Sequence, residues 1–168
     1  MHKLIPILIV ALSASFAFAD VIEIEAEAAE VDASNIVESE KASGGKVVSF
    51  TKQTKASKLT FEFEVPADGE YQLWANAFGA SGNADSFYVQ LDKGERETWD
   101  TVGRALTMQP IRKRITLENN KLKAEAWVTE LTKGKHTLVV SRREAGAVLD
   151  KIFIAPKDVD MKSYAKKK

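Results

Sequence analysis

The sequence predicts an all-β protein built as a β-sandwich or barrel, on three observations. Apolar and polar residues alternate strictly over residues 58–65 (Lys-Leu-Thr-Phe-Glu-Phe-Glu-Val). About nine short segments of strand character follow one another at close spacing, separated by turn residues. No segment carries the 3.6-residue apolar period of an amphipathic helix.

The segment 58–65 is the plainest strand. Successive side chains of a strand point to opposite faces, so Leu59, Phe61 and Phe63 are expected to face a core. Pro-Ala-Asp-Gly-Glu at 66–70 then predicts a turn, because proline presets φ and Asp-Gly favours a tight reversal. Such a pattern is typical of a half-buried antiparallel sheet.

The other predicted strands share short length, apolar or β-branched content and flanking turn residues. They are 21–26, 47–50, 71–78, 87–91, 112–117, 125–130, 136–142 and 149–154. The Glu-Ala-rich start is assigned to a strand because Ile22 and Ile24 alternate with Glu23 and Glu25. Residues 100–123 are the least regular and are expected to hold a long loop.

Residues 1–19 predict a secretory signal peptide. A positive start at Lys3 precedes an apolar run over 4–18, and Ala-Phe-Ala at 17–19 is a small-x-small cleavage site before Asp20. The run is short for a membrane span, and a retained amphipathic anchor is the alternative. We therefore expect a secreted or periplasmic product with one β-sandwich domain over 20–156 and a short basic tail over 157–168.

Charge and cysteine content exclude several classes of protein. Removal of residues 1–19 takes away one cation, so the mature charge is 23 − 24 = −1. A nearly neutral chain gives no sign of the clustered basic face that DNA or RNA binding needs. The chain has no cysteine, which excludes a disulfide framework and a thiolate metal site. No insertion into a membrane is expected.

Six groups of residues, taken in chain order, resemble the carbohydrate-binding modules of families 6 and 35, more closely family 35. They are 24–28 (IEAEA), 42–48 (ASGGKVV), 68–75 (DGEYQLWA), 85–89 (DSFYV), 131–138 (LTKGKHTL) and 143–152 (REAGAVLDKI). The resemblance implies a galactose-binding-like β-jelly roll of two antiparallel sheets. It also implies a structural calcium ion near the chain ends and a sugar site among the loops at one edge.

The calcium expectation has a basis in the residues. Calcium takes six to eight hard oxygen ligands, carboxylates and carbonyls among them. Glu25 and Glu27 are two residues apart, so on a strand they share a face. The resemblance implies that they surround the metal with Asp150, and that the turn from Ser43 to Lys46 adds carbonyls. The alternative is that both glutamates form the solvent face of an edge strand.

A sugar site needs exposed aromatic rings beside hydrogen-bonding groups, because pyranose rings present apolar C–H faces. Trp99, in polar surroundings, is the first candidate for a stacking platform, with core packing as the alternative. Trp127 is a second candidate, although its position favours packing on a strand. Trp74, between Leu73 and Ala75, is expected in the core.

Polar candidates for the sugar site are Asn83 and Asp85 in a Gly-rich loop, and Arg143 and Glu144 before the last strand. Arg143 can hold a uronate carboxylate in a bidentate grip, or it can form a surface ion pair. Many modules of the resembled families place a sugar-binding asparagine just before Leu-Asp of the last strand. Here residues 145–148 are Ala-Gly-Ala-Val, so that group is missing.

The predicted function is therefore a secreted, non-catalytic module that binds a polysaccharide or glycan. A structural or adhesive protein that uses the same fold to bind proteins or cell surfaces is the first alternative, and a small jelly-roll polysaccharide-degrading enzyme the second. No nucleophile elbow or zinc-protease motif is present, and His136 is the one histidine of the mature chain. A separate secreted enzyme or surface protein is a possible partner.

Overall fold

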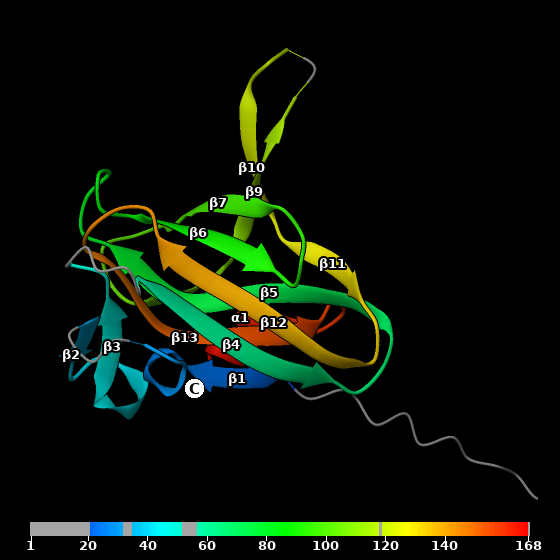
Figure 1. Cartoon of the computed structure of the whole chain (residues 1–168), viewed down its shortest axis with the longest axis horizontal. Helices are drawn as coiled ribbons and strands as arrows, with labels where there is room; N and C mark the ends of the chain where they lie inside the picture. Colours follow the sequence, from blue (N-terminus) through cyan, green and yellow to red (C-terminus); the bar gives the residue numbers. More distant parts are fainter. Residues whose placement is uncertain (1–20, 32–34, 52–56, 118, 168) are drawn as a thin grey trace, which may run out of the picture.

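The computed structural model describes residues 21–31, 35–51, 57–117 and 119–167. It is an all-β sandwich of a seven-stranded and a four-stranded antiparallel sheet, with a separate two-stranded hairpin (Figure 1), so the predicted fold class is confirmed. The strands are β1 (Ile22–Glu25), β2 (Ile36–Glu38), β3 (Lys46–Ser49), β4 (Lys58–Val65), β5 (Gly69–Gly79), β6 (Ser86–Leu91), β7 (Arg96–Asp100), β8 (Thr107–Pro110), β9 (Arg112–Thr116), β10 (Leu122–Ala126), β11 (Val128–Leu131), β12 (Gly134–Arg142) and β13 (Ala147–Pro156). Short 3₁₀ helices, η1 (Ala26–Ala28) and η3 (Ser43–Gly45), and the helix α1 (Met161–Ala165) complete the described elements.

The long strands β5 and β13 form the centre of the seven-stranded sheet, whose order is β11-β5-β13-β3-β2. β1 also pairs with β13, and β8 also pairs with β5. Each central strand therefore has one long neighbour along one edge and two short neighbours along the other edge, so its middle is paired on both edges. The four-stranded sheet has the order β4-β12-β6-β7.

The alternation in β4 is the clearest link between sequence and packing. Leu59, Phe61, Phe63 and Val65 are buried, whereas Lys58, Glu62 and Glu64 are exposed. The buried set packs between the two sheets with inward residues of the other strands. Burial of such side chains stabilises the fold by about 1.5–3 kcal/mol each.

The hairpin of β9 and β10 projects away from the sandwich (Figure 1). All five side chains of β10 are exposed. Two contacts hold its base: Arg114 forms an ion pair with Asp100, with Nη2 and Oδ1 2.6 Å apart, and Lys113 Nζ lies 4.4 Å from the centroid of the Trp127 ring. An isolated two-stranded ribbon is marginal in water, so these contacts matter to it.

The C-terminal segment, predicted only as a short basic tail over 157–168, contains a helix that packs on the sheet. Asp160 caps α1, because its Oδ1 accepts hydrogen bonds from the backbone N–H groups of Lys162 and Ser163. Met161 is 2% exposed and packs with Trp74 and Phe153 on the outer face of the seven-stranded sheet. Met161, with the partly buried Val159 and Tyr164, thus covers the apolar side chains on this face of the sheet.

Two further differences concern the strands. The region 100–123, expected to hold a long loop, contains β8 and the first two residues of β10 besides the strand predicted over 112–117, and the polar segment 96–100 forms β7. The strand predicted over 125–130 is divided into β10 and β11, and the break falls at Trp127. Among the residues that the structure describes, no helix is long and apolar enough to cross a bilayer.

Candidate functional site

The pairing of β1 with β13 brings two of the residues predicted to hold calcium, Glu25 and Asp150, near one another. Glu25 lies opposite Lys151, whose Nζ is 2.8 Å from Glu25 Oε1 and 3.1 Å from Glu23 Oε2. The Ser43 hydroxyl also donates to Glu25, 2.6 Å from Oε2. Burial opposes the charge of Lys151, but hydrogen bonds from its ammonium to Glu25 and Glu23 outweigh it and raise its pKa. Glu25 therefore has two protein partners.

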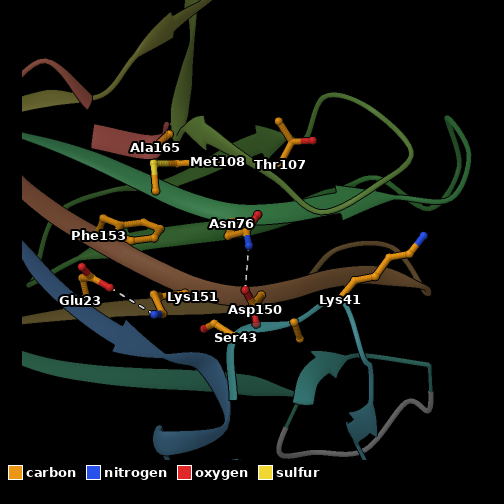
Figure 2. Close-up of a pocket in the computed structure, with 11 residues that line it drawn as sticks. Glu23, Lys41, Ser43, Asn76, Thr107, Met108, Asp150, Lys151, Phe153 and Ala165 are labelled. Carbon is orange, nitrogen blue, oxygen red and sulfur yellow. Dashed lines mark hydrogen bonds and ion pairs between the residues drawn. The ribbon is translucent and has the colours of Figure 1, made fainter. Parts of the chain in front are cut away.

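A β-bulge in β13 controls what faces outward beside this pair. Leu149 lies opposite Ala77 and Lys151 opposite Asn76, so Asp150 is an extra residue in the strand. Because of the bulge, both Asp150 and Lys151 lie on the outer face of the sheet. The Asn76 amide donates to Asp150 Oδ2 over 2.7 Å (Figure 2).

Asp150 is fully buried, and burial raises the pKa of its carboxyl group even though hydrogen bonds from Asn76 and the Ser43 backbone lower it. Its Oδ1 atom has no hydrogen-bond partner in the described structure, and neither does Oε2 of Glu27. Gly44 approaches Glu27 so closely that an added Cβ would lie 3.0 Å from Oε1. Two buried carboxylate oxygens thus lack a partner near one turn.

The residues fit a hard-oxygen metal site in part. Over the described ranges, no three acidic or histidine side chains converge closely enough to hold a metal, so Glu25, Glu27 and Asp150 do not form a three-carboxylate cage. Calcium accepts backbone carbonyls beside carboxylates, and the turn over 43–46 supplies them close to Glu27. The Lys46 side chain is exposed at the start of β3, so only its carbonyl could contribute.

The loop edge of the sandwich joins the β5–β6 loop to the β12–β13 loop. Arg143 Nη1 donates to Ser86 Oγ over 2.7 Å and to Glu144 Oε1 over 2.8 Å. The backbone N–H of Asp85 donates to Glu144 Oε2 over 3.2 Å. Three of the four predicted polar residues therefore meet, whereas Asn83 is exposed on the same loop and makes none of these contacts.

The two carboxyl groups at this edge have opposite pKa shifts. Burial and the neighbouring Glu144 raise the pKa of Asp85. Burial opposes ionisation of Glu144 too, but hydrogen bonds from Ser86 and from the Asp85 N–H, together with the charge of Arg143, lower its pKa. The surroundings of this edge therefore favour ionisation of Glu144 over ionisation of Asp85.

Trp99 corrects the expectation of an exposed platform. It is fully buried, and its ring stacks on Phe87 with centroids 5.4 Å apart and an interplanar angle of 26°. In β7 it lies opposite Phe87, so both residues point into the core despite the polar residues beside them. No face of this ring is open to a sugar.

Trp127 is buried, as its favoured packing role predicted, so it offers no platform for a sugar either. It is 4% exposed, and its backbone N–H donates to the carbonyl of Ile111, between β8 and β9, while its carbonyl accepts from the N–H of Leu73 in β5. Trp74 is confirmed as buried, with Nε1 donating to Gln72 Oε1 over 2.7 Å. None of the three tryptophans lies exposed at the loop edge.

Sequence reasoning missed Asn76 and Lys151. Simple alternation in β13 would place Lys151 on the inner face beside Leu149, and the bulge at Asp150 reverses this. A lysine directly after an aspartate in an apolar strand, with two glutamates at 23 and 25, was the available signal. Asn76, the polar residue in the apolar centre of β5, was the second.

The fold defines the class of protein: a galactose-binding-like jelly roll of the kind found in carbohydrate-binding modules of families 35 and 6. Within this class, residues 24–165 match the glycosyl hydrolase family 115 C-terminal domain, and the chain belongs to that family. The match extends through α1. No curated protein matches the sequence.

Solved structures similar to this chain share its fold at low sequence identity. The GH26-CBM35 β-(1,4)-mannanase of Podospora anserina has a TM-score of 0.60 and 17% identity, and the match covers 83% of this chain but 28% of the enzyme. A family 35 carbohydrate-binding module from Clostridium thermocellum has a TM-score of 0.52 and 18% identity, with coverage of 81% and 98%. The C-terminal CBM6 of LamC, a marine laminarinase from Zobellia galactanivorans, has a TM-score of 0.52 and 16% identity, with coverage of 81% and 99%. The chain thus spans less than a third of the mannanase and nearly the whole of the isolated modules.

Proposed function

We propose that this domain is a secreted, non-catalytic carbohydrate-binding module that recognises a polysaccharide or glycan at its loop edge. The fold supports this, because structures that span the same length are carbohydrate-binding modules. The observation that carries the proposal is the fixed guanidinium of Arg143, held by Ser86 and Glu144 beside Asp85.

Arg143 is oriented before any ligand arrives. A guanidinium has five N–H donors in a rigid plane, and the hydrogen bonds to Ser86 and Glu144 use only Nη1. The Arg143 side chain is 30% exposed, so the remaining donors can reach a ligand. A planar fork of this kind fits two neighbouring sugar hydroxyls or a uronate carboxylate. With no tryptophan at this edge, we expect hydrogen bonds rather than stacking to supply most of the affinity.

The test is affinity electrophoresis and calorimetry of the purified protein, with calcium, against a panel of plant, algal and microbial polysaccharides. Arg143→Ala should weaken binding at least tenfold. Arg96→Ala removes the same charge from the outer face of the four-stranded sheet, where Arg96 stacks on Tyr88, and should bind normally. Equal loss in both variants, or no binding to any glycan, would overturn the proposal, and the second result would favour the adhesive alternative.

We include a structural calcium ion in this proposal. Its support is the pair of partnerless oxygens, Glu27 Oε2 and Asp150 Oδ1, close to a glycine-containing turn. These carboxylates would hold the ion, with Glu25 adjacent and carbonyls from Ser43 to Lys46 completing its oxygen shell. A bound ion would neutralise buried negative charge and stabilise the contact between the first and last strands.

Secretion and the absence of catalysis have separate tests. The signal peptide over 1–19 lies outside the described residues and is supported by sequence alone. Amino-terminal sequencing of protein from culture medium or periplasm should begin at Asp20, and a retained Met1 would contradict cleavage. The same polysaccharide panel should show no release of reducing sugar. Release that survives further purification would make the domain an enzyme.

A further inference from the structure

A pocket of about 550 Å³ lies on the outer face of the seven-stranded sheet, away from the loop edge. Its floor is the middle of β5 and β13, and its walls come from β1, β8, the turn before η3 and the end of α1 (Figure 2). The volume lies within the range of about 300–1,000 Å³ that is typical of small-molecule sites. The loop-edge sugar site proposed above does not use this pocket, and the proposed calcium ion shares only Asp150 and Ser43 with it.

The polar groups on the floor are held in place by the protein itself. The Asn76 amide donates to Asp150 Oδ2, so the amide is oriented with its carbonyl oxygen available as an acceptor. The Lys151 ammonium is fixed by Glu23 and Glu25 and keeps a third N–H. Fixed donors and acceptors cost little further ordering when a ligand binds.

The pocket has an apolar end and a polar end. Figure 2 shows Met108, Phe153 and Ala165 grouped on one side, with Thr107 and Lys41 on the other. The helix α1 supplies Ala165 because Met161 anchors it on the sheet and the Tyr164 hydroxyl donates to Glu23. An amphipathic lining of this kind suits a ring with one apolar face and several hydroxyl groups.

The charges of the lining cancel. Lys41 and Lys151 contribute two positive charges, and Glu23 and Asp150 contribute two negative charges in their ionised forms. Beside the calcium ion proposed at Asp150, a neutral ligand therefore meets side chains whose charges compensate one another. A phosphate, sulfate or uronate would have to approach both carboxylates.

From these features we propose that the pocket over Asn76 and Lys151 is a second carbohydrate subsite, which holds one neutral pyranose ring. The ring places hydroxyl groups against Asn76 and Lys151, and its C–H face against Met108. This inference rests on the proposed function as a carbohydrate-binding module, but it uses different residues from the loop edge. Two subsites on one domain would let it hold two chains, or two parts of one chain, at once.

The experiment is a ¹H–¹⁵N NMR titration of the purified protein, in calcium, with neutral methyl pyranosides of glucose, galactose, mannose and xylose. At least one should shift the resonances of Asn76, Thr107 and Met108, and these shifts should persist in Arg143→Ala. Met108→Trp fills the apolar end and should weaken this binding at least tenfold. Leu122→Trp adds the same side chain at a position that is 65% exposed on the projecting hairpin, and it should have no effect.

Each outcome decides between the two sites. If Met108→Trp fails to fold by its thermal melt, Lys41→Ala at the exposed polar end replaces it, with at least a threefold loss expected. Shifts confined to residues 79–86 and 143–147 would overturn this inference and leave the loop-edge proposal intact. If polysaccharides bind at the loop edge but no pyranoside shifts the pocket residues, the inference fails alone. No sugar binding of any kind would overturn both proposals.

Discussion

The Nδ1 atom of His136 lies 2.8 Å from Oδ2 of Asp92, and its Nε2 lies 2.7 Å from the carbonyl oxygen of Thr132. Both ring nitrogens therefore face acceptors, an arrangement that only the protonated imidazolium satisfies completely. Burial opposes the charge, but the hydrogen bonds to Thr132 and Asp92 outweigh it and raise the pKa of His136 above its ordinary value of 6.5. The contact joins the β6–β7 turn to β12.

This contact should make stability depend on pH. A histidine whose pKa is raised in the folded state stabilises fully below the unfolded pKa of 6.5, and the stabilisation is lost as pH rises through the folded pKa. We expect the free energy of unfolding in urea to fall as the pH rises above 6.5. In Asp92→Asn the amide oxygen can still accept from Thr137, but the fall should be smaller and should end at lower pH, because the folded pKa of His136 is raised less. An unchanged pH profile in His136→Gln would contradict this origin.

Trp99→Ala should destabilise the fold by about 3–5 kcal/mol, because it removes a fully buried ring that stacks on Phe87. Trp99→Phe should cost less, since it keeps an aromatic ring and removes an indole N–H that has no hydrogen-bond partner in the described structure. Denaturant titration measures both. A variant with wild-type stability but lost sugar binding would restore the platform hypothesis.

Gly79 and Gly82 offer a matched pair at the loop edge. A Cβ added at Gly79 would lie 2.2 Å from Cβ and 2.3 Å from Cα of Asp85, whereas nothing lies within 4 Å of one added at Gly82. Gly79→Ala must therefore displace the loop, with a loss of about 1–3 kcal/mol and weaker glycan binding. Gly82→Ala should be close to wild type in both. Normal binding by Gly79→Ala would show that the position of Asp85 does not matter.

Calcium removal should lower the thermal midpoint, because a ligand that binds only the native state stabilises it. We expect a chelator to lower the midpoint and excess calcium to restore it, as measured by calorimetry. Glu27→Gln should abolish the response, and Glu62→Gln, on the exposed face of β4, should keep it. An identical midpoint after exhaustive chelation would rule out the structural ion.

Met161→Ala should cost about 2–5 kcal/mol, because Met161 is 2% exposed against Trp74 and Phe153. Lys162→Ala, on the exposed side of the same turn, should change stability by less than about 0.5 kcal/mol. Denaturant titration of the two variants separates them. Equal stability of the two variants would show that Met161 does not anchor this segment on the sheet.

The sequence predicted the strands whose core and solvent faces differ in polarity, such as β4, where buried and exposed residues alternate as expected. It failed for Trp99, because the inward direction of a residue in the polar strand β7 depends on its register with β6. Which residue of β6 lies opposite a given residue of β7 depends on the packing of the whole sheet, and not on the residues next to it in the sequence. The five-residue helix α1 is also too short to show a helical period.

At the candidate site, the sequence identified residues but not their contacts. Arg143, Glu144 and Asp85 meet because two loops distant in the chain are adjacent in the fold. The roles of Asn76 and Lys151 depend on one extra residue in β13, and a bulge leaves no reliable mark on a sequence pattern. Local patterns can therefore locate a strand, yet they cannot fix the face to which each side chain after a bulge points.

The position of β13 in the sheet bears on how the chain folds. It pairs with β5, β1 and β3, and its partner residues in β5 lie far earlier in the chain, from 147 − 79 = 68 positions for Ala147 and Gly79 to 156 − 71 = 85 for Pro156 and Tyr71. Contacts of such large sequence separation slow folding to roughly the millisecond-to-second range. The centre of the larger sheet cannot close until the last strand has been synthesised. Until then the backbone N–H and C=O groups along one edge of β5 and of β1 are unpaired, and their apolar side chains are incompletely covered. A truncated chain would therefore be prone to aggregate.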